Sequence, residues 1–129
     1  MALPPIPPVI GSRRRPVPSW GKPLPYPIVI ADRRNNRLIE VTPDKRVVWE
    51  FPSPDLKPSL ARELPDTGDV IVADDLRERV VVIDRKTKDF IWQYGVTDRK
   101  GHAPGYLNYP DGFDLDVFYD WKGALGNKP

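Results

Sequence analysis

The residues that could perform chemistry are few in this sequence and lie late in the chain. His102 is its one histidine, and it follows Lys100 in a loop rich in glycine and proline. A catalytic histidine needs a nucleophile or a carboxylate that the fold holds beside it. The sequence has no Gly-x-Ser-x-Gly motif and no second histidine. These observations argue against an enzyme, and we identify no catalytic residue.

Four aspartates form the only acidic cluster that suggests a metal site: Asp111, Asp114, Asp116 and Asp120. Carboxylate oxygens can hold Ca²⁺, but Gly112 stands at the wrong place for an EF-hand loop. We favour the alternative, a turn at Asp111 followed by a solvent-facing edge. The chain has no cysteine, no zinc-type spacing and no phosphate-binding glycine loop. We therefore predict no metal and no cofactor.

One dense basic run could contact a partner. Arg13, Arg14 and Arg15 could touch phosphate or an acidic protein surface, or they could be solvated. The net charge is 20 − 18 = +2, so no overall field favours nucleic acid or an anionic membrane. Aromatic residues for stacking on bases are absent beside the run, apart from Trp20. We therefore expect a protein partner, or a second copy of the chain, rather than a nucleic acid.

The basic run lies in a proline-rich arm, residues 1–27. Proline fixes φ and removes an N–H donor, so the arm cannot be a helix or a central strand. We predict an extended arm that lies against a protein surface, with a disordered tail as the alternative. Its predicted contact residues are apolar, aromatic or basic: Leu3, Ile6, Val9, Ile10, Arg13, Arg14, Arg15, Trp20 and Tyr26.

The start of the chain does not resemble a secretory signal. Its apolar residues are interleaved with prolines, and the basic run follows them instead of preceding them. No apolar run approaches the ~20 residues of a membrane span. We therefore expect a protein of the cytoplasm or of a large assembled particle, with no signal peptide and no membrane span.

From residue 28 onward, the sequence predicts short antiparallel strands. Runs rich in β-branched and aromatic residues at 28–31, 37–41 and 47–51 are separated by turn-forming residues. The same pattern returns at 70–74, 79–84 and 89–94, where an additional strand over 59–64 comes first. The offset between the repeats is 73 − 31 = 42 at the alanines and 92 − 49 = 43 at the tryptophans. A period near 42 with three or four strands indicates propeller-type blades.

Two pairs of residues recur at equivalent positions of the repeats. Trp49 and Trp92 could stack on a ligand, but their repetition favours packing, and we predict that both are buried. Asp32 and Asp74 each follow a strand, and we predict that they accept backbone N–H bonds in the turn. We interpret both pairs as structural.

The repeats resemble the NHL-like and quinoprotein-like β-propellers, including the arylsulfotransferase-type repeats. The resemblance rests on the text from Ala31-Asp32 to Trp49-Glu50-Phe51 and on Ala73-Asp74 to Trp92-Gln93-Tyr94-Gly95, and it covers about 28–116. It implies an all-β fold of four-stranded antiparallel blades. Arylsulfotransferase-type activity would require a catalytic histidine in a complete propeller, and one loop histidine argues against it.

The sequence contains strands for about two blades, whereas a closed propeller needs roughly 4–8. We divide the chain into the arm (1–27), two blade-like repeats with one extra strand over 109–116 (28–116), and a tail (117–129). We expect a non-enzymatic structural or accessory subunit of a larger assembly, which docks through the arm and the blade surface. The alternatives are a ring of several copies that binds a ligand on its axis and, third, an arylsulfotransferase-like enzyme.

Overall fold

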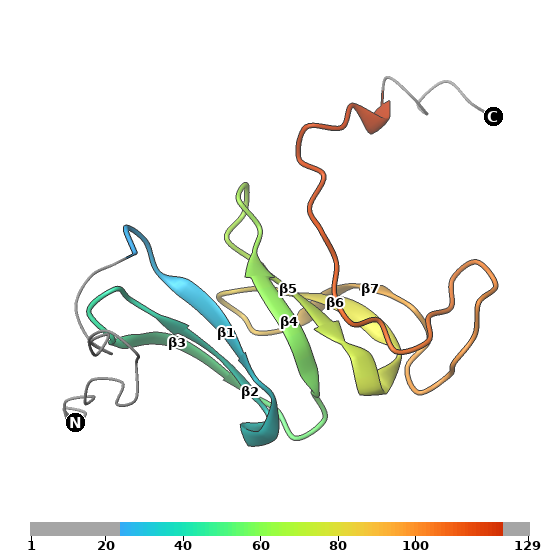
Figure 1. The fold of residues 1–129 in the computed structure, drawn as a ribbon, viewed down its shortest axis with the longest axis horizontal. Coiled ribbons are helices and arrows are strands. Elements are labelled where there is room, and N and C mark those ends of the chain that lie inside the picture. The colour runs from blue at the N-terminus through green and yellow to red at the C-terminus, as the bar shows by residue number, and fades with distance from the viewer. Residues whose placement is uncertain (1–23, 123–129) are drawn as a thin grey trace, which may run out of the picture.

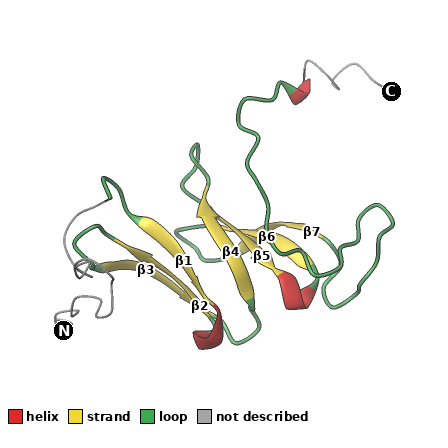
Figure 2. Cartoon of the chain, viewed as in Figure 1, coloured by secondary structure: helices red, strands yellow, loops and turns green. Residues whose placement is uncertain are grey.

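The computed structural model describes residues 24–122, and its regular structure is almost entirely β. Sheet A contains three strands in the order β1-β2-β3, and sheet B contains four in the order β4-β5-β6-β7 (Figures 1 and 2). All neighbours are antiparallel and consecutive in the chain. The strands are β1 (Ile28–Asp32), β2 (Arg37–Val41), β3 (Val47–Pro52), β4 (Pro58–Glu63), β5 (Val70–Asp74), β6 (Arg79–Ile83) and β7 (Phe90–Tyr94). The predicted all-β class is confirmed.

Tight connections hold the strands in register. A 3-10 turn follows β1 (η1, Arg33–Asn35) and another follows β5 (η2, Asp75–Arg77). Each turn ends on a residue in the left-handed region, Asn36 with φ 52° and Glu78 with φ 63°. These turns bring the strand ends together, so that Asp32 lies opposite Arg37 in sheet A. The equivalent pair in sheet B has the same register.

The core lies between the two sheets. Because side chains alternate along a strand, each sheet directs every second residue toward the other sheet. We call this side the inner face of each sheet. The buried cluster joins Leu38 and Phe51 of sheet A to Val70, Val72, Val81 and Ile83 of sheet B. Leu56, in the connection between the sheets, is fully buried in the same cluster.

Aromatic rings join the inner faces at one side of the core. Phe51 of β3 stacks on Phe90 of β7, with ring centroids 6.0 Å apart. Trp49 lies beside Phe51 at 6.3 Å, and its indole N–H donates to the carbonyl of Arg85 at 2.9 Å. The two sheets therefore form one packed unit.

One predicted strand is absent. Residues 109–116 form no strand, although the segment from 111 to 117 runs past β4 (Figure 1). Ser59 Oγ donates to the Asp111 carbonyl at 3.1 Å, and Arg62 lies 3.8 Å from Asp114. The prediction was wrong for the chain alone, since a strand requires a backbone partner and this segment forms no ladder. Tyr109, with φ 52°, also departs from strand geometry.

Candidate interaction surfaces

The two sides of the sheet pair that point away from the core carry many apolar side chains, beside charged ones such as Glu50 and Arg62. We call them the outer faces. The outer face of sheet A carries Ile28, Ile30, Ile39, Val41, Val47 and Val48, and that of sheet B carries Leu60, Ile71, Val80, Val82, Trp92 and Tyr94. Val48 is 51% exposed and Trp92 is 50% exposed. Ile39 and Val82 are buried, whereas other large side chains on the two faces are accessible to a partner.

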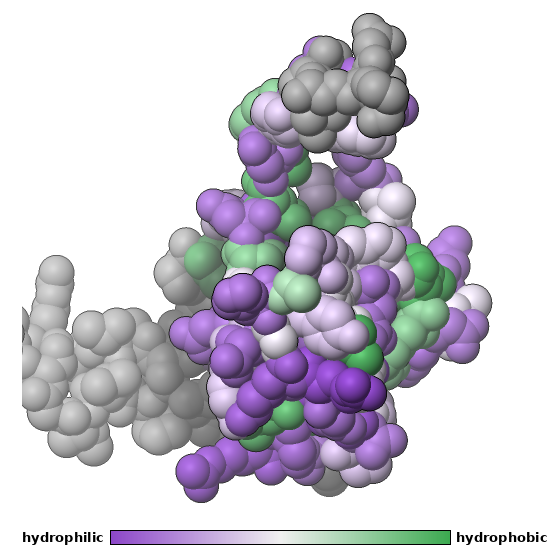
Figure 3. Space-filling model, turned by 90° about the vertical axis from the view of Figure 1, so that its right-hand side faces the viewer, coloured by the Kyte–Doolittle hydropathy of each residue, from purple (hydrophilic) through white to green (hydrophobic). Residues whose placement is uncertain are grey.

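The chain that follows β7 covers one end of the outer face of sheet B. Gly95, with φ +98°, lets this segment leave the strand close to Leu107. The Tyr94 hydroxyl accepts from the Gly105 N–H at 2.9 Å, and Gly112 passes beside Leu60. Seen from this side, the surface is mostly hydrophilic with scattered apolar patches (Figure 3). The Trp92 side chain remains half exposed beyond this cover.

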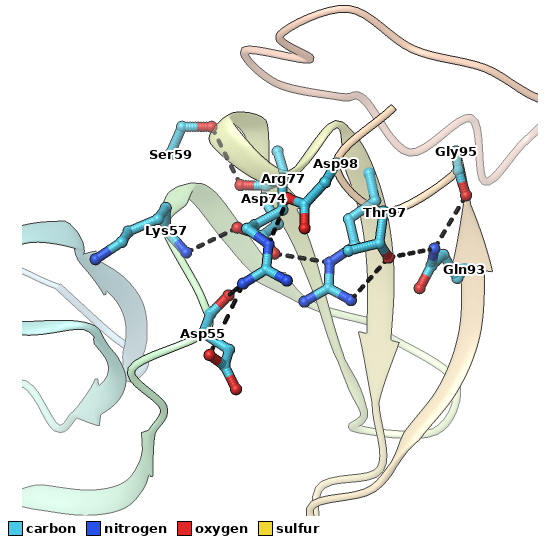
Figure 4. A network of polar contacts seen from close by, with 11 residues as sticks. Asp55, Lys57, Ser59, Asp74, Arg77, Gln93, Gly95, Thr97 and Asp98 are labelled. Atoms are coloured by element: carbon cyan, nitrogen blue, oxygen red, sulfur yellow. Dashed lines mark hydrogen bonds and ion pairs between the residues drawn. The ribbon is translucent and has the colours of Figure 1, made fainter. Parts of the chain in front are cut away.

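A polar network closes the end of sheet B near the inter-sheet connection (Figure 4). Its centre is Asp74, which is fully buried and accepts from the Lys57 backbone N–H at 2.7 Å and from Arg79 Nε at 2.8 Å. Arg79 also donates to Thr97 Oγ1 at 3.2 Å. The predicted backbone bonds within the turn were wrong, because the carboxylate binds an arginine and the connecting segment instead. The network ties the connection to sheet B, which is a structural role.

Two arginines bridge the sheets. Arg85 binds Glu40 of sheet A and, at 3.2 Å, Glu63 of sheet B, while its guanidinium lies 5.5 Å from the Trp49 ring. Arg33 of η1 donates to Asp75 Oδ2 of η2 at 2.9 Å. Sequence reasoning missed both bridges. The bridges join residues 45 and 42 positions apart, and no local pattern in the sequence indicates such pairings.

The paired tryptophans are equivalent in register but not in burial. Trp49 lies opposite Glu40, and Trp92 lies opposite Val82, as the repeat predicts. Trp49 packs against the core, whereas Trp92 is on the outer face of sheet B. The prediction that both are buried was wrong for Trp92, which is half exposed, and it held only in part for Trp49, which is half-buried.

Most of the predicted partner-binding residues lie outside the described residues: Leu3, Ile6, Val9, Ile10, Arg13, Arg14, Arg15 and Trp20. Tyr26 is described and is 62% exposed. It lines an open groove between β1 and β4, together with Glu40, Arg62 and Glu63. The groove places one predicted arm residue beside charged side chains of both sheets.

The described residues contain no candidate metal centre. In residues 24–122, no group of three histidine or acidic side chains is arranged to hold an ion. Asp114 points into solvent, with its side chain 96% exposed and Arg62 as a distant ion-pair partner. His102 occupies an exposed loop position. The structure brings neither of these residues into a site.

Three carboxyl groups have a lowered pKa, and each lies at or beside a turn. Hydrogen bonds from Asn35 and Arg37 lower the pKa of Asp32. A hydrogen bond from Thr42 lowers the pKa of Asp44 in the β2–β3 turn. The backbone N–H groups of Thr87 and Lys86 lower the pKa of Asp84 in the β6–β7 turn. All three shifts follow from local hydrogen bonds.

None of the protein-family models, curated proteins and solved structures compared with this chain matches it. Within residues 24–122, no helix is long and apolar enough to cross a membrane. Function is therefore inferred from the surfaces described above, and the two outer faces are the most substantial of them.

Proposed function

We propose that this chain is a non-enzymatic structural or accessory subunit of a larger assembly, and that its sheets are two β-propeller-type blades. The observation that carries the proposal is the pair of apolar outer faces. A blade buries its faces only against neighbours, so a unit of two blades leaves one face open at each end. Contiguous exposed apolar surface typically marks a site of protein association.

The proline-rich arm is the second element of the proposal. A proline-rich segment is already extended and loses little entropy on binding, which suits a docking strap. The proposed contacts are the apolar and basic residues between Leu3 and Tyr26. Support comes from Tyr26, which stands exposed in the groove where the described chain begins.

A second candidate is a ring of several copies that binds a ligand on its axis. The groove between β1 and β4 favours it, because Glu40, Arg62 and Glu63 give this groove both signs of charge. Such a site would take a small polar ligand. In this candidate also, the outer faces are contact surfaces and not catalytic sites.

Site-specific photo-crosslinking in the cells that produce the protein tests the assembly proposal. A photoreactive phenylalanine analogue replaces Val48 or Trp92 in the full chain, and a third variant carries it at Asp66, an exposed turn residue on neither outer face. We expect protein adducts from the first two positions and none from the third. An absence of adducts at both face positions would contradict the proposed function.

A further inference from the structure

The repeat makes the outer face of sheet B equivalent to the inner face of sheet A. A shift of 42 residues carries Val29, Ala31 and Leu38 onto Ile71, Ala73 and Val80. A shift of 43 carries Trp49 and Phe51 onto Trp92 and Tyr94. The first set is the surface on which sheet B packs within the chain. The outer face of sheet B therefore resembles the inner face of sheet A, on which the inner face of sheet B packs.

The converse equivalence holds at the other end of the molecule. The inner face of sheet B consists mainly of Val70, Val72, Val81 and Ile83, with Phe90 at one side. The equivalent residues of sheet A are Ile28, Ile30, Ile39, Val41 and Val47, and these form its outer face. The outer face of sheet A thus corresponds to the inner face of sheet B, and the outer face of sheet B corresponds to the inner face of sheet A. The two inner faces pack on each other within the chain, so the two outer faces have the residues to pack in the same way.

We propose that the partner at these faces is a second copy of this chain. The outer face of sheet B in one copy packs on the outer face of sheet A in the next, and this head-to-tail contact repeats the contact between the sheets inside each chain. The inference rests on the proposed function, because it specifies the partner that the outer faces bind. Such a contact is heterologous, so it forms a ring or a filament rather than a twofold dimer.

The side chains at the proposed contact are complementary. Inside the chain, Glu40 pairs with Arg85 across the core. At the proposed contact their equivalents are Val82 and Pro43 of the next copy, so both charges are replaced by apolar groups together. These two positions therefore bury no unpaired charge, which would otherwise cost several kcal/mol. This joint replacement favours a second copy over an unrelated partner.

Charge complementarity is also kept at the 3-10 turns. Within the chain, Arg33 pairs with Asp75. The repeat shift carries Arg33 onto Asp75, so the head-to-tail contact brings Asp75 of one copy toward Arg33 of the next. Opposite charges therefore meet at both contacts. A twofold contact would instead pair each outer face with a copy of itself, and the repeat provides no such pairing inside the chain.

The segment after the sheets has a direction that suits the same contact. Its contacts with β4 advance together, from Ser59 with Asp111 to Arg62 with Asp114, so residues 111–117 run parallel to β4. Within the described residues, β1 pairs only with β2 and has a free edge. In sheet B, the strand equivalent to β1 is β5, which has antiparallel β4 at that edge. Residues 111–117 thus have the direction needed to extend sheet A of the next copy.

Two substitutions that each block one face test the proposal. Trp92→Arg places a charge on the outer face of sheet B, and Val48→Arg does so on that of sheet A, while Asp66→Arg serves as the control. Both target side chains are half exposed, and circular dichroism with thermal unfolding verifies that each variant folds. If Trp92→Arg fails to fold, Leu60→Lys replaces it. The particle mass is measured by size-exclusion chromatography with light scattering over a series of concentrations.

We expect the unmodified chain and the control to associate into particles of several copies. Each face variant alone should be a monomer of 14.7 kDa, with association weakened by about tenfold or more. An equal mixture of the two face variants should form a dimer that grows no further, because each supplies the face that the other lacks. A monomeric unmodified chain, association by either variant alone, or a mixture that stays monomeric would each overturn the proposal.

The outcomes separate this inference from the proposed function. If the unmodified chain is a monomer and photo-crosslinking at Trp92 traps a different protein, the self-contact is wrong and the assembly function stands. If the chain is a monomer and the outer faces yield no adduct, both are wrong. An adduct between Trp92 and β1 or β3 of a second copy supports both.

Discussion

At the scale of single residues, an equivalent aspartate–arginine ion pair in each sheet differs in its burial. Asp74 and Arg79 form this pair in sheet B, and Asp32 and Arg37 form it in sheet A, each at 2.8 Å. The sheet B pair is nearly solvent-free, whereas the side chains of the sheet A pair are 35% and 28% exposed. Removing one partner of a buried pair leaves an uncompensated charge, whereas a partly exposed pair is screened by water.

We therefore predict that Arg79→Met destabilises the fold by about 3–5 kcal/mol. The matched substitution Arg37→Met should cost about 0–1 kcal/mol. Urea unfolding followed by circular dichroism gives both values. Equal costs would show that the difference in burial does not control the contribution of the pair.

The Asp84 carboxylate in the β6–β7 turn makes a pH-dependent contribution to the free energy of unfolding. Because its pKa is lowered in the folded chain, the folded state favours the charged form, and the turn is stabilised above the ordinary pKa of 3.8. This contribution should be lost as the pH falls through the lowered folded-state pKa. Carboxyl ¹³C chemical shifts measured against pH locate the Asp84 transition. A midpoint at or above the ordinary value would contradict the prediction.

The two tryptophans should differ in their contribution to the stability of a single chain. Trp49 contacts the core and donates to Arg85, whereas Trp92 lies on an outer face. Full truncation of a packed tryptophan costs about 3–5 kcal/mol. We expect Trp49→Ala to approach the lower part of this range, and Trp92→Ala to cost under about 1 kcal/mol in the monomer. Denaturant unfolding at low protein concentration measures both, and a large cost at Trp92 would show that it is packed within the chain.

At the scale of elements, the sequence predicted the seven strands to within about one residue. The predicted strand over 59–64 is β4, Pro58–Glu63, and the one over 89–94 is β7, Phe90–Tyr94. β-Branched runs between turn residues are local signals, so they locate strands reliably. The predicted strand over 109–116 failed because pairing depends on a neighbour, which local sequence does not specify. The exposure of Trp92 escaped prediction for the same reason.

Gly95 shows how one residue sets the path of the element that follows β7. Its φ of +98° and its close approach to sheet B leave no room for a side chain, since an added Cβ would lie 2.4 Å from the Glu78 carbonyl oxygen. Gly105 has a similar φ of +92°, but an added Cβ there would meet no atom within 4 Å. The two glycines therefore separate backbone strain from steric overlap.

We predict that Gly105→Ala costs about 1 kcal/mol, the lower end of the range for a strained backbone. Gly95→Ala should cost at least about 2 kcal/mol more, because the backbone of β6 or β7 must also move. Thermal unfolding compares the two variants. Amide hydrogen exchange in β6 and β7 should rise in Gly95→Ala alone, and equal effects of the two substitutions would contradict the steric explanation.

At the scale of the whole molecule, stability and association are assigned to different parts of the chain. Among residues 24–122, the buried cluster lies between Leu38 and Ile83, and the side chains packed against it begin at Val29. Of the arm, residues 24–27 are described, and none of these four belongs to this cluster. In contrast, the proposed contacts with partners involve the arm and the outer faces of the sheets. Deleting the arm should therefore separate the two properties.

We predict that deletion of residues 1–22 leaves the β-sheet circular dichroism signal and the unfolding temperature nearly unchanged. Binding to a different protein should be lost, because the arm supplies that contact in our proposal. Head-to-tail association should persist, because the outer faces remain, and light scattering on the shortened chain measures it directly. Trp92→Arg in the shortened chain is the matched control, which should be monomeric. If the shortened chain instead unfolds, the arm completes the core, and its role as a docking segment is wrong.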